Sequence, residues 1–202
     1  MGGTGSKGES QQILLLGLSG SGKSLFLKKL LELKKEIREN LIESTVGYNF
    51  VSLEYFYNKF HIWDLGGDSI TRSYWSTFYR NLRFNIVIYF INLYDDSSYM
   101  TMMKELIILL NEEELKQARF FILFNIKPDE NKKLISNDET TQREQREKIE
   151  VILADLRECP IHEYETRVKW GSIDVSKMKD GENNTVELLA KCLFGNNNKS
   201  DE

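Results

Sequence analysis

Short apolar runs alternate along the chain with segments in which apolar residues recur at every third or fourth position. Four of the short runs are expected to be strands, and they occupy residues 13–16, 86–93, 120–124 and 168–175. The run 86–93 is almost continuously apolar, which is typical of a strand covered on both faces. Residues 51–65 are expected to form two further strands around a turn at Tyr57, Asn58 and Lys59.

Helical spacing of apolar residues marks the segments between these runs. The expected helices occupy residues 26–41, 103–110, 149–156 and 186–193, and the last of them ends at Gly195. The highly charged segment 127–148 is expected to be a solvated insertion whose second half is helical. Strands that alternate with helices predict an α/β fold with a mostly parallel sheet, and the hairpin predicts one antiparallel edge.

Composition narrows the class of protein. The 202 residues fit one domain, and 27 basic against 31 acidic residues leave a net charge of -4, which disfavours nucleic acid as a partner. Two cysteines, Cys159 and Cys192, are too few for a disulfide scaffold and are expected to be reduced thiols of a cytoplasmic protein. We expect a flexible leader at 1–11, one folded domain at 12–194 and a disordered polar tail at 195–202.

A phosphate-binding loop is the strongest motif. Eight consecutive residues match G-x-x-x-x-G-K-[ST] between an expected strand and an expected helix: Gly17, Leu18, Ser19, Gly20, Ser21, Gly22, Lys23 and Ser24. The glycines allow backbone amides to surround phosphate oxygens, the lysine neutralises the β- and γ-phosphates, and the last serine coordinates Mg²⁺. The alternative is a glycine-rich turn that happens to precede Lys-Ser. The motif predicts a nucleoside triphosphate and Mg²⁺.

Two later segments supply groups that respond to phosphate and metal. Thr45 follows Lys23 by 22 residues, and its hydroxyl is expected to complete the Mg²⁺ shell from a loop that the triphosphate orders; the alternative is an ordinary threonine in a turn. Asp64 ends an apolar strand and is expected to hold Mg²⁺ through water. Gly67, three residues later, has no side chain and can bring its backbone N–H to the γ-phosphate.

These segments resemble the ADP-ribosylation-factor branch of small GTPases. The resemblance is carried by Thr-Val-Gly-Tyr-Asn at 45–49, by Trp-Asp-Leu-Gly-Gly at 63–67 and by Trp75, and it covers roughly residues 12–194. It implies the P-loop small-GTPase fold, with a six-stranded sheet flanked by helices on both faces. It also implies a monomeric GTP/GDP switch that works with an exchange factor, an activating protein and effectors in membrane traffic, at the Golgi or the cilium.

The same resemblance implies an effector-facing aromatic cluster at Tyr48, Trp63 and Phe78, for which the alternative is ordinary core packing. It also identifies the position after the Gly-Gly pair, where the family usually has a glutamine that orients the attacking water. This chain has Asp68 there, and a carboxylate repels the γ-phosphate and cannot both donate and accept as an amide does. We therefore expect hydrolysis, for which Gly67 and Asp68 are the catalytic positions, to be slow or partner-dependent.

Guanine recognition also departs from the family pattern. Asn125 stands at the end of a strand as the family requires, but Lys127 and Asp129 follow in a segment one residue longer than Asn-Lys-x-Asp. Asp129 reaches the guanine if the extra residue bulges out, and without it discrimination against ATP weakens. Ser176 and Lys177 resemble the loop whose backbone amide meets the guanine oxygen. GTP is therefore the favoured nucleotide.

The first residues carry a lipidation motif. Met1-Gly2-Gly3-Thr4-Gly5-Ser6 fits the pattern for myristoylation at Gly2, and the alternative is a flexible leader without a lipid. A single myristoyl chain gives weak, reversible membrane binding. No segment approaches the ~20 apolar residues that a membrane span requires. The expected location is therefore cytoplasmic with peripheral membrane association.

Two other functions use the same phosphate-binding loop. The first is a small-molecule kinase, which needs a lid with arginines directed at the phosphates; the charged segment has Arg143 and Arg146 but no recognisable lid pattern. The second is a pseudo-GTPase that binds nucleotide without cycling, a function that Asp68 makes plausible. The order Thr45, Asp64, Gly67 favours the switch over both.

Overall fold

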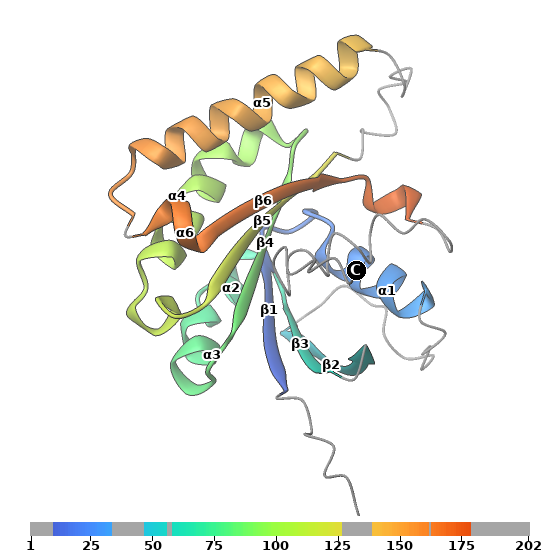
Figure 1. The fold of residues 1–202 in the computed structure, drawn as a ribbon, viewed down its shortest axis with the longest axis vertical. Coiled ribbons are helices and arrows are strands. Elements are labelled where there is room, and N and C mark those ends of the chain that lie inside the picture. Colours follow the sequence, from blue (N-terminus) through green and yellow to red (C-terminus); the bar gives the residue numbers. More distant parts are fainter. Residues whose placement is uncertain (1–9, 34–46, 56–57, 127–138, 162, 179–202) are drawn as a thin grey trace, which may run out of the picture.

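The computed structural model describes residues 10–33, 47–55, 58–126, 139–161 and 163–178. One six-stranded sheet forms its centre, with the strand order β2-β3-β1-β4-β5-β6 (Figure 1). All neighbouring strands are parallel except β2 and β3, which form an antiparallel hairpin at one edge. The strands are β1 Gln11–Gly17, β2 Tyr48–Tyr55, β3 Asn58–Leu65, β4 Ile86–Asn92, β5 Arg119–Asn125 and β6 Val168–Ile173. The predicted α/β architecture is thus confirmed.

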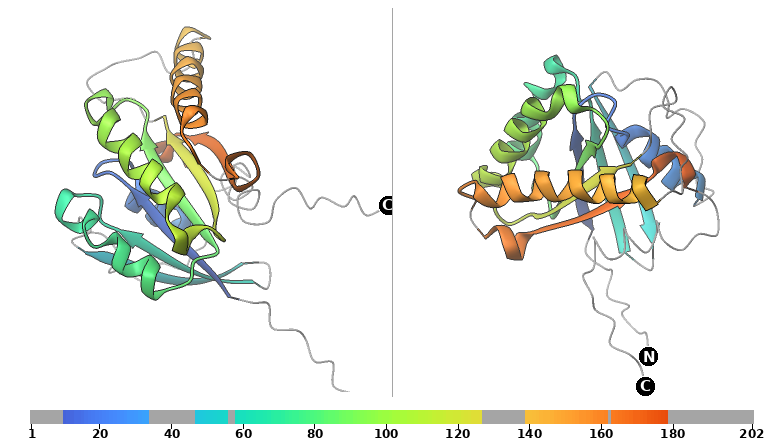
Figure 2. Two further views of the ribbon diagram at one scale, coloured as in Figure 1. Left: turned by 90° about the vertical axis from the view of Figure 1, so that its left-hand side faces the viewer. Right: turned by 90° about the horizontal axis from the view of Figure 1, so that it is seen from above.

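Helices cover both faces of this sheet, as the two views of Figure 2 show. The α-helices are α1 Lys23–Leu33, α2 Ser69–Arg72, α3 Trp75–Asn81, α4 Tyr99–Asn111, α5 Glu139–Glu158 and α6 Tyr164–Arg167. The described residues also form three short 3₁₀ turns, η1 Asp96–Ser98, η2 Glu113–Leu115 and η3 Val175–Lys177. Helix α1 packs on one face, and α3, α4 and α5 pack on the other. No helix in the described part of the chain has the length and apolar character needed to cross a bilayer.

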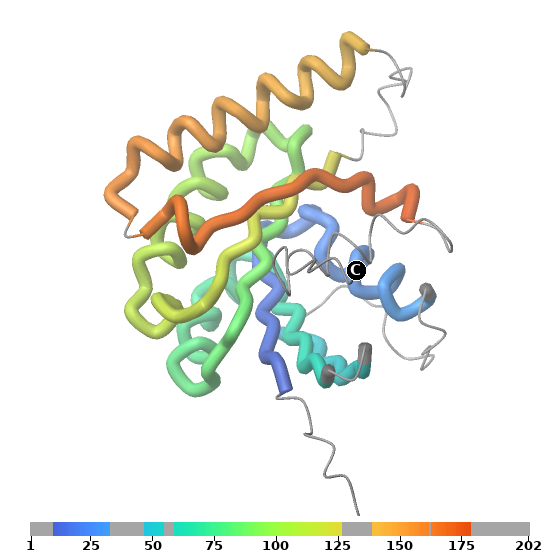
Figure 3. The backbone as a smooth tube through the Cα atoms, viewed as in Figure 1, coloured from blue at the N-terminus to red at the C-terminus, as the bar shows by residue number. Residues whose placement is uncertain are grey.

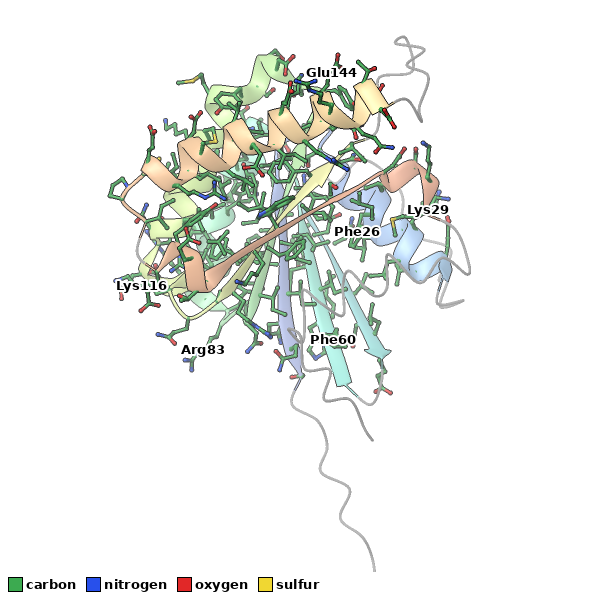
Figure 4. The ribbon with its side chains drawn as sticks, turned by 45° about the horizontal axis from the view of Figure 1, so that its top comes forward. Phe26, Lys29, Phe60, Arg83, Lys116 and Glu144 are labelled. Atoms are coloured by element: carbon green, nitrogen blue, oxygen red, sulfur yellow. The ribbon has the colours of Figure 1, made fainter. Side chains whose placement is uncertain are left out.

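The alternation of side chains along β1 divides the core into two layers. Ile13 and Leu15 point toward α1, whereas Leu14 and Leu16 point toward α4 and α5, and all four are buried. In the α1 layer the rings of Phe26 and Phe90 meet edge to face with 5.1 Å between centroids. Figure 4 shows Phe26 on α1 and Phe60 on β3 in this layer. Burial on both faces explains why the central strands are continuously apolar.

Several element boundaries differ from those the sequence predicts. The last strand ends at Ile173 rather than at residue 175, because the Asp174 carboxylate accepts the Ser176 N–H at 3.0 Å and begins η3. Gln11, expected in the leader, is the first residue of β1 and pairs with Phe60. The helical second half of the charged segment is present as the start of α5. The expected helix at 186–193, the tail and the later part of the helix at 26–41 lie outside the described residues.

The chain path places four of the described loops with predicted chemistry at one end of the sheet. Because β1, β3, β4 and β5 are parallel, their carboxyl ends meet at the same edge, which can be followed in the tube of Figure 3. The loops after Gly17, Leu65, Asn92 and Asn125 all leave the sheet there. Ligands of open α/β sheets bind in crevices at this edge.

Candidate functional site

Glycines shape the loop between β1 and α1. Gly17 has φ 139° and Gly22 has φ 101°, both in the region that favours glycine. A Cβ on Gly17 would lie 2.4 Å from the Phe90 carbonyl oxygen, and one on Gly22 would lie 2.5 Å from Asn125 Nδ2. Neither position therefore accepts a side chain. The loop folds tightly enough for the Gly22 carbonyl to accept the Phe26 N–H at 2.9 Å, in the first turn of α1.

Lys23 lies buried beneath this loop, with an exposed fraction of 5%. Its ammonium donates to the carbonyl oxygens of Gly17 at 2.8 Å and Leu18 at 3.1 Å and to Ser21 Oγ at 3.4 Å, all of which are uncharged. Burial lowers the pKa of Lys23 from 10.5 to about 8, although the Asp64 carboxylate opposes this effect. A phosphate beside the ammonium would supply the anion that its hydrogen-bond partners lack, so the site fits a phosphate.

Asp64 lies fully buried at the end of β3 and faces the start of α1. Its Oδ2 accepts from Ser24 Oγ at 2.7 Å and from Asn49 Nδ2 at 3.4 Å. A carboxylate and a hydroxyl side by side at the phosphate loop form the all-oxygen donor set that Mg²⁺ prefers together with phosphate oxygens and water. Ser24 and Asp64 therefore fit a Mg²⁺ ion that accompanies a nucleotide.

Gly67 rests directly on the phosphate loop. Its carbonyl accepts the Ser19 N–H at 3.1 Å and Arg72 Nη1 at 2.8 Å. A Cβ on Gly67 would lie 2.4 Å from the Gly17 oxygen and 2.4 Å from the Leu18 carbonyl carbon, so only glycine allows this approach. In this conformation the Ser19 amide binds the loop after β3. A phosphate that uses the same amide has to displace the Gly67 carbonyl.

The buried Trp75 forms a hydrogen bond with Gly66, the residue before Gly67. Trp75 Nε1 donates to the Gly66 carbonyl at 2.9 Å, and the Gly66 N–H donates to the Gly47 carbonyl at 2.9 Å. The loop after β3 is thus joined to α3 on one side and to the residue before β2 on the other. Arg72 adds a contact to Glu105 of α4 at 3.3 Å. Movement of Gly67 would therefore be transmitted to several elements.

Asp68 caps the short helix α2. Its Oδ1 accepts the N–H groups of Ile70 at 3.0 Å and Thr71 at 2.9 Å, and its Oδ2 accepts Thr71 Oγ1 at 2.6 Å. The hydrogen bonds from Thr71, side chain before backbone, lower the pKa of Asp68, so the carboxylate stays charged at neutral pH. Both oxygens are engaged with the chain's own helix.

Asn125 joins the phosphate loop to the loop after β6. Its Nδ2 donates to the Ser21 carbonyl at 3.1 Å, and its Oδ1 accepts the Val175 N–H at 3.4 Å. Ser176 and Lys177 lie in η3, where both contact the Asp174 carboxylate: Ser176 Oγ is 2.5 Å from Oδ1 and Lys177 Nζ is 3.4 Å from Oδ2. The structure thus brings the predicted base-binding loop onto the phosphate loop.

Comparison with known proteins decides the family. A model of the ADP-ribosylation factor family matches residues 3–171, which is most of the chain. The chain belongs to this family of small GTPases.

Individual members of the family are also similar to this chain in sequence. ADP-ribosylation factor-like protein 1 of Saccharomyces cerevisiae is 36% identical over 115 residues, 56% of this chain and 59% of that protein. ADP-ribosylation factor-like protein 2 of Dictyostelium discoideum is 35% identical over 119 residues, 59% of this chain and 61% of that protein. The chain thus spans about three-fifths of the length of these relatives. The Trypanosoma brucei small GTPase Arl6, solved with the nucleotide analogue GppNp, has the same fold: TM-score 0.64 and 19% identity over 91% of this chain and 96% of that chain.

Four aromatic side chains gather on the face of the β2–β3 hairpin that α1 does not cover. We call the set Tyr48, Phe50, Trp63 and Phe78 the aromatic patch. Ring centroids lie 5.7 Å apart for Tyr48 and Trp63, 5.1 Å for Tyr48 and Phe78, and 4.6 Å for Phe50 and Trp63. Tyr48 is 52% exposed and Phe50 45% exposed. Core packing therefore does not account for Tyr48, and the patch is available as a surface.

Sequence reasoning missed some members of the site. Phe50 has the alternation signal, because it lies two residues after Tyr48 on the same strand and so on the same face. Gln12, which accepts Trp63 Nε1 at 2.9 Å, and Asp174 carry no such signal. Gly2, Thr45, Lys127 and Asp129 lie outside the described residues, so their predicted roles remain predictions.

Proposed function

We propose that this chain is a GTP/GDP-binding molecular switch that depends on Mg²⁺. One observation carries the proposal: the Ser19 N–H of the phosphate loop donates to the Gly67 carbonyl at 3.1 Å. Phosphate and the loop after β3 therefore compete for one amide. A ligand shifts a conformational equilibrium only when it interacts differently with the two states, and this competition is such a difference.

The nucleotide would bind across the phosphate loop. Backbone amides of residues 17–24 and the Lys23 ammonium bind its phosphates, and Ser24, Thr45 and, through water, Asp64 hold Mg²⁺. The metal neutralises phosphate charge. Asn125, Lys127 and Asp129 together with Ser176 and Lys177 bind the base and favour guanine. The contacts of Asn125 to Ser21 and Val175 support this assignment, because they fix the base loop against the phosphate loop.

Hydrolysis is proposed to be slow without a partner. The water-orienting position holds Asp68, whose two oxygens accept hydrogen bonds from Ile70 and Thr71 of its own chain. A charged carboxylate in this position repels the γ-phosphate and does not donate a hydrogen bond. An activating protein would then supply the missing group. The capping role of Asp68 also supports the second candidate, a pseudo-GTPase that binds nucleotide and hardly cycles.

The aromatic patch is proposed to bind effectors. Tyr48 and Phe50 of the patch are exposed, whereas Trp63 and Phe78 are partly buried against the core. Asp64 follows Trp63 on β3, so a partner on the patch contacts the strand that carries a residue of the proposed nucleotide site. We further propose a monomer that works in membrane or ciliary traffic. It would meet an exchange factor and would reach membranes weakly through a myristoyl group on Gly2.

Exchange kinetics with fluorescent GDP, GTP and ATP analogues, with and without Mg²⁺, test the proposal. We expect saturable binding of both guanine nucleotides, weaker binding of ATP, and faster release when Mg²⁺ is chelated. Lys23→Ala should abolish binding, whereas Lys28→Ala, on the exposed side of α1, should leave it unchanged. The absence of guanine-nucleotide binding by folded wild type contradicts the proposal, and transfer of phosphate from ATP to a small molecule indicates the kinase instead.

A further inference from the structure

A pocket lies beside the phosphate loop, between the end of β4, the turn η1 and the first half of α5. It has a volume of ≈ 390 Å³, within the usual range of ligand pockets of about 300–1,000 Å³. Its apolar lining consists of Ile91, Leu93, Tyr99, Met102, Val151 and Ile152. Val151 is 57% exposed, an unusual position for an apolar side chain on a helix that packs against the core. We call this the α4–α5 pocket.

Acidic side chains surround this apolar floor. The lining contains Asp95, Asp96, Glu144 and Glu147 and a single base, Lys148, so four negative charges against one positive charge leave the pocket at -3. Figure 4 shows Glu144 on α5. A rim of one sign attracts ligands of the opposite charge and repels phosphate-bearing ones.

Two of these four carboxylates, Asp95 and Glu144, are not in an ion pair with any described residue. Lys148 pairs with Asp96 at 2.8 Å, and Glu147 pairs with Arg143 at 2.8 Å. Asp95 accepts hydrogen bonds from uncharged groups, the Ser97 hydroxyl at 2.7 Å and Ser98, and these hydrogen bonds lower the pKa of Asp95, which keeps the group ionised. Glu144 has no ion pair with any residue in the described ranges.

The pocket also adjoins the phosphate loop. A small hollow of ≈ 20 Å³ lined by Leu18, Ser19 and Ser21 shares Asn92, Asp95 and Met102 with the larger pocket. The aromatic patch lies elsewhere, on the β2–β3 hairpin at the edge of the sheet. The chain therefore has a second apolar surface. Its rim is acidic, which is opposite in charge to what a phosphate site requires.

We propose that the α4–α5 pocket binds a basic amphipathic segment of a partner protein, with its apolar side chains on Val151 and Met102 and its lysines or arginines at Asp95 and Glu144. The apolar lining gives such a segment area to bury, and the net charge of -3 matches its basic face. An acidic peptide or an anionic membrane meets the same rim with repulsion. This surface adds a binding site to the proposed switch and does not depend on nucleotide turnover.

The experiment uses a fluorescent synthetic helix built of leucine and lysine as the probe, titrated with the full chain and followed by anisotropy and by backbone amide chemical shifts. We expect one saturable site with shifts confined to residues 91–102 and 144–152. Glu144→Lys with Glu147→Lys should weaken binding about tenfold, since each lost or reversed rim contact is worth a factor of a few. Val151→Ser should also weaken it. Glu150→Lys with Glu158→Lys, which change the net charge by the same four units at exposed positions of α5 outside the pocket lining, are the matched control and should change affinity less than twofold.

Several results overturn the proposal. Among them are no saturable binding of the probe up to about 1 mM, equal weakening by the control and the rim variants, or equal binding of a leucine–glutamate helix. Self-association in sedimentation that Val151→Ser abolishes would assign the pocket to a second copy of the chain. Tighter probe binding after Lys132→Glu with Lys133→Glu would assign it to the chain's own basic residues. Thermal unfolding by circular dichroism verifies that each variant is folded.

Discussion

Nucleotide binding should be accompanied by the uptake of a proton at mildly alkaline pH, because the pKa of Lys23 is lowered in the free protein. Burial lowers the pKa of this lysine from 10.5 to about 8, and the nearby positive charge of Arg72 adds to the effect while Asp64 and Asp68 oppose it. A phosphate beside the ammonium favours the charged form and raises the pKa again. At pH 8.5 most free protein is then neutral at Lys23, and most complex is charged.

The size of the effect follows from the two pKa values. If the bound value returns to 10.5, about 0.7 proton is taken up per GDP at pH 8.5 and about 0.1 proton at pH 7. The affinity at pH 8.5 should be about fourfold weaker than at pH 7, because the lysine must be protonated before it pairs with phosphate. The lowered pKa corresponds to about 3 kcal/mol of unfavourable free energy for the charged lysine in the free protein at neutral pH.

Calorimetric titration with GDP in buffers of different ionisation enthalpy counts the protons directly. The measurement at pH 7 in the same buffers is the internal control. Proton uptake near zero at pH 8.5, with tight binding retained, would refute the idea that Lys23 is held partly neutral. The lowered pKa also determines the direction in which the free energy of unfolding changes with pH. Unfolded Lys23 binds more protons than folded Lys23 between about pH 8 and 10.5, so this residue alone makes the nucleotide-free chain more stable as the pH rises through that window.

Three further substitutions test other parts of the site. Gly22→Ala should weaken GDP binding more than tenfold in a fluorescence titration, because its φ of 101° disfavours a side chain and its Cβ would lie 2.5 Å from Asn125 Nδ2; an unchanged affinity would contradict the loop geometry. Asp68→Gln should raise the single-turnover rate of GTP hydrolysis, since an amide both donates and accepts, and a rate no higher than wild type would count against the role given to this position. Trp75→Phe removes the buried hydrogen bond to the Gly66 carbonyl of 2.9 Å and should lower the free energy of unfolding in urea by about 1–3 kcal/mol; a loss within error would show that the carbonyl finds another partner.

The parts of the fold that the sequence predicts are those that depend on local pattern. Continuous apolar runs indicate β4 and β5 because both faces of these strands are buried. Apolar residues at every third or fourth position indicate α4 because one face of this helix is buried. The phosphate loop is predictable to the residue, because Gly17 and Gly22 occupy backbone positions that only glycine fits. In each case the sequence signal lies within a few neighbouring residues, although the atoms that exclude a Cβ at Gly17 and Gly22 belong to Phe90 and Asn125.

The parts that the sequence does not predict depend on contacts between distant residues. Nothing near Gly67 in the sequence indicates that its carbonyl meets the Ser19 amide, since the two residues belong to different loops that the parallel sheet brings together. The pairing of Asp68 with Thr71 is local, but the resemblance to a glutamine position directs attention to catalysis rather than to helix capping. The α4–α5 pocket likewise combines residues of β4 with residues of α5 that lie more than 50 positions later.

The two contacts at the phosphate loop have different consequences for a switch. Relief of the unfavourable free energy of the buried Lys23 charge, about 3 kcal/mol, accompanies any phosphate that reaches it, so it separates the loaded protein from the empty one. The hydrogen bond between Ser19 and Gly67 responds to whatever displaces that carbonyl, and one such bond is worth about 1 kcal/mol, or about fivefold. Moving an equilibrium from 1:99 to 99:1 needs about 5.5 kcal/mol. The loop contact alone is too weak for a complete transition between two loaded forms. The difference would have to come from further contacts, such as those proposed for Thr45 and Mg²⁺, or from a protein bound to the aromatic patch.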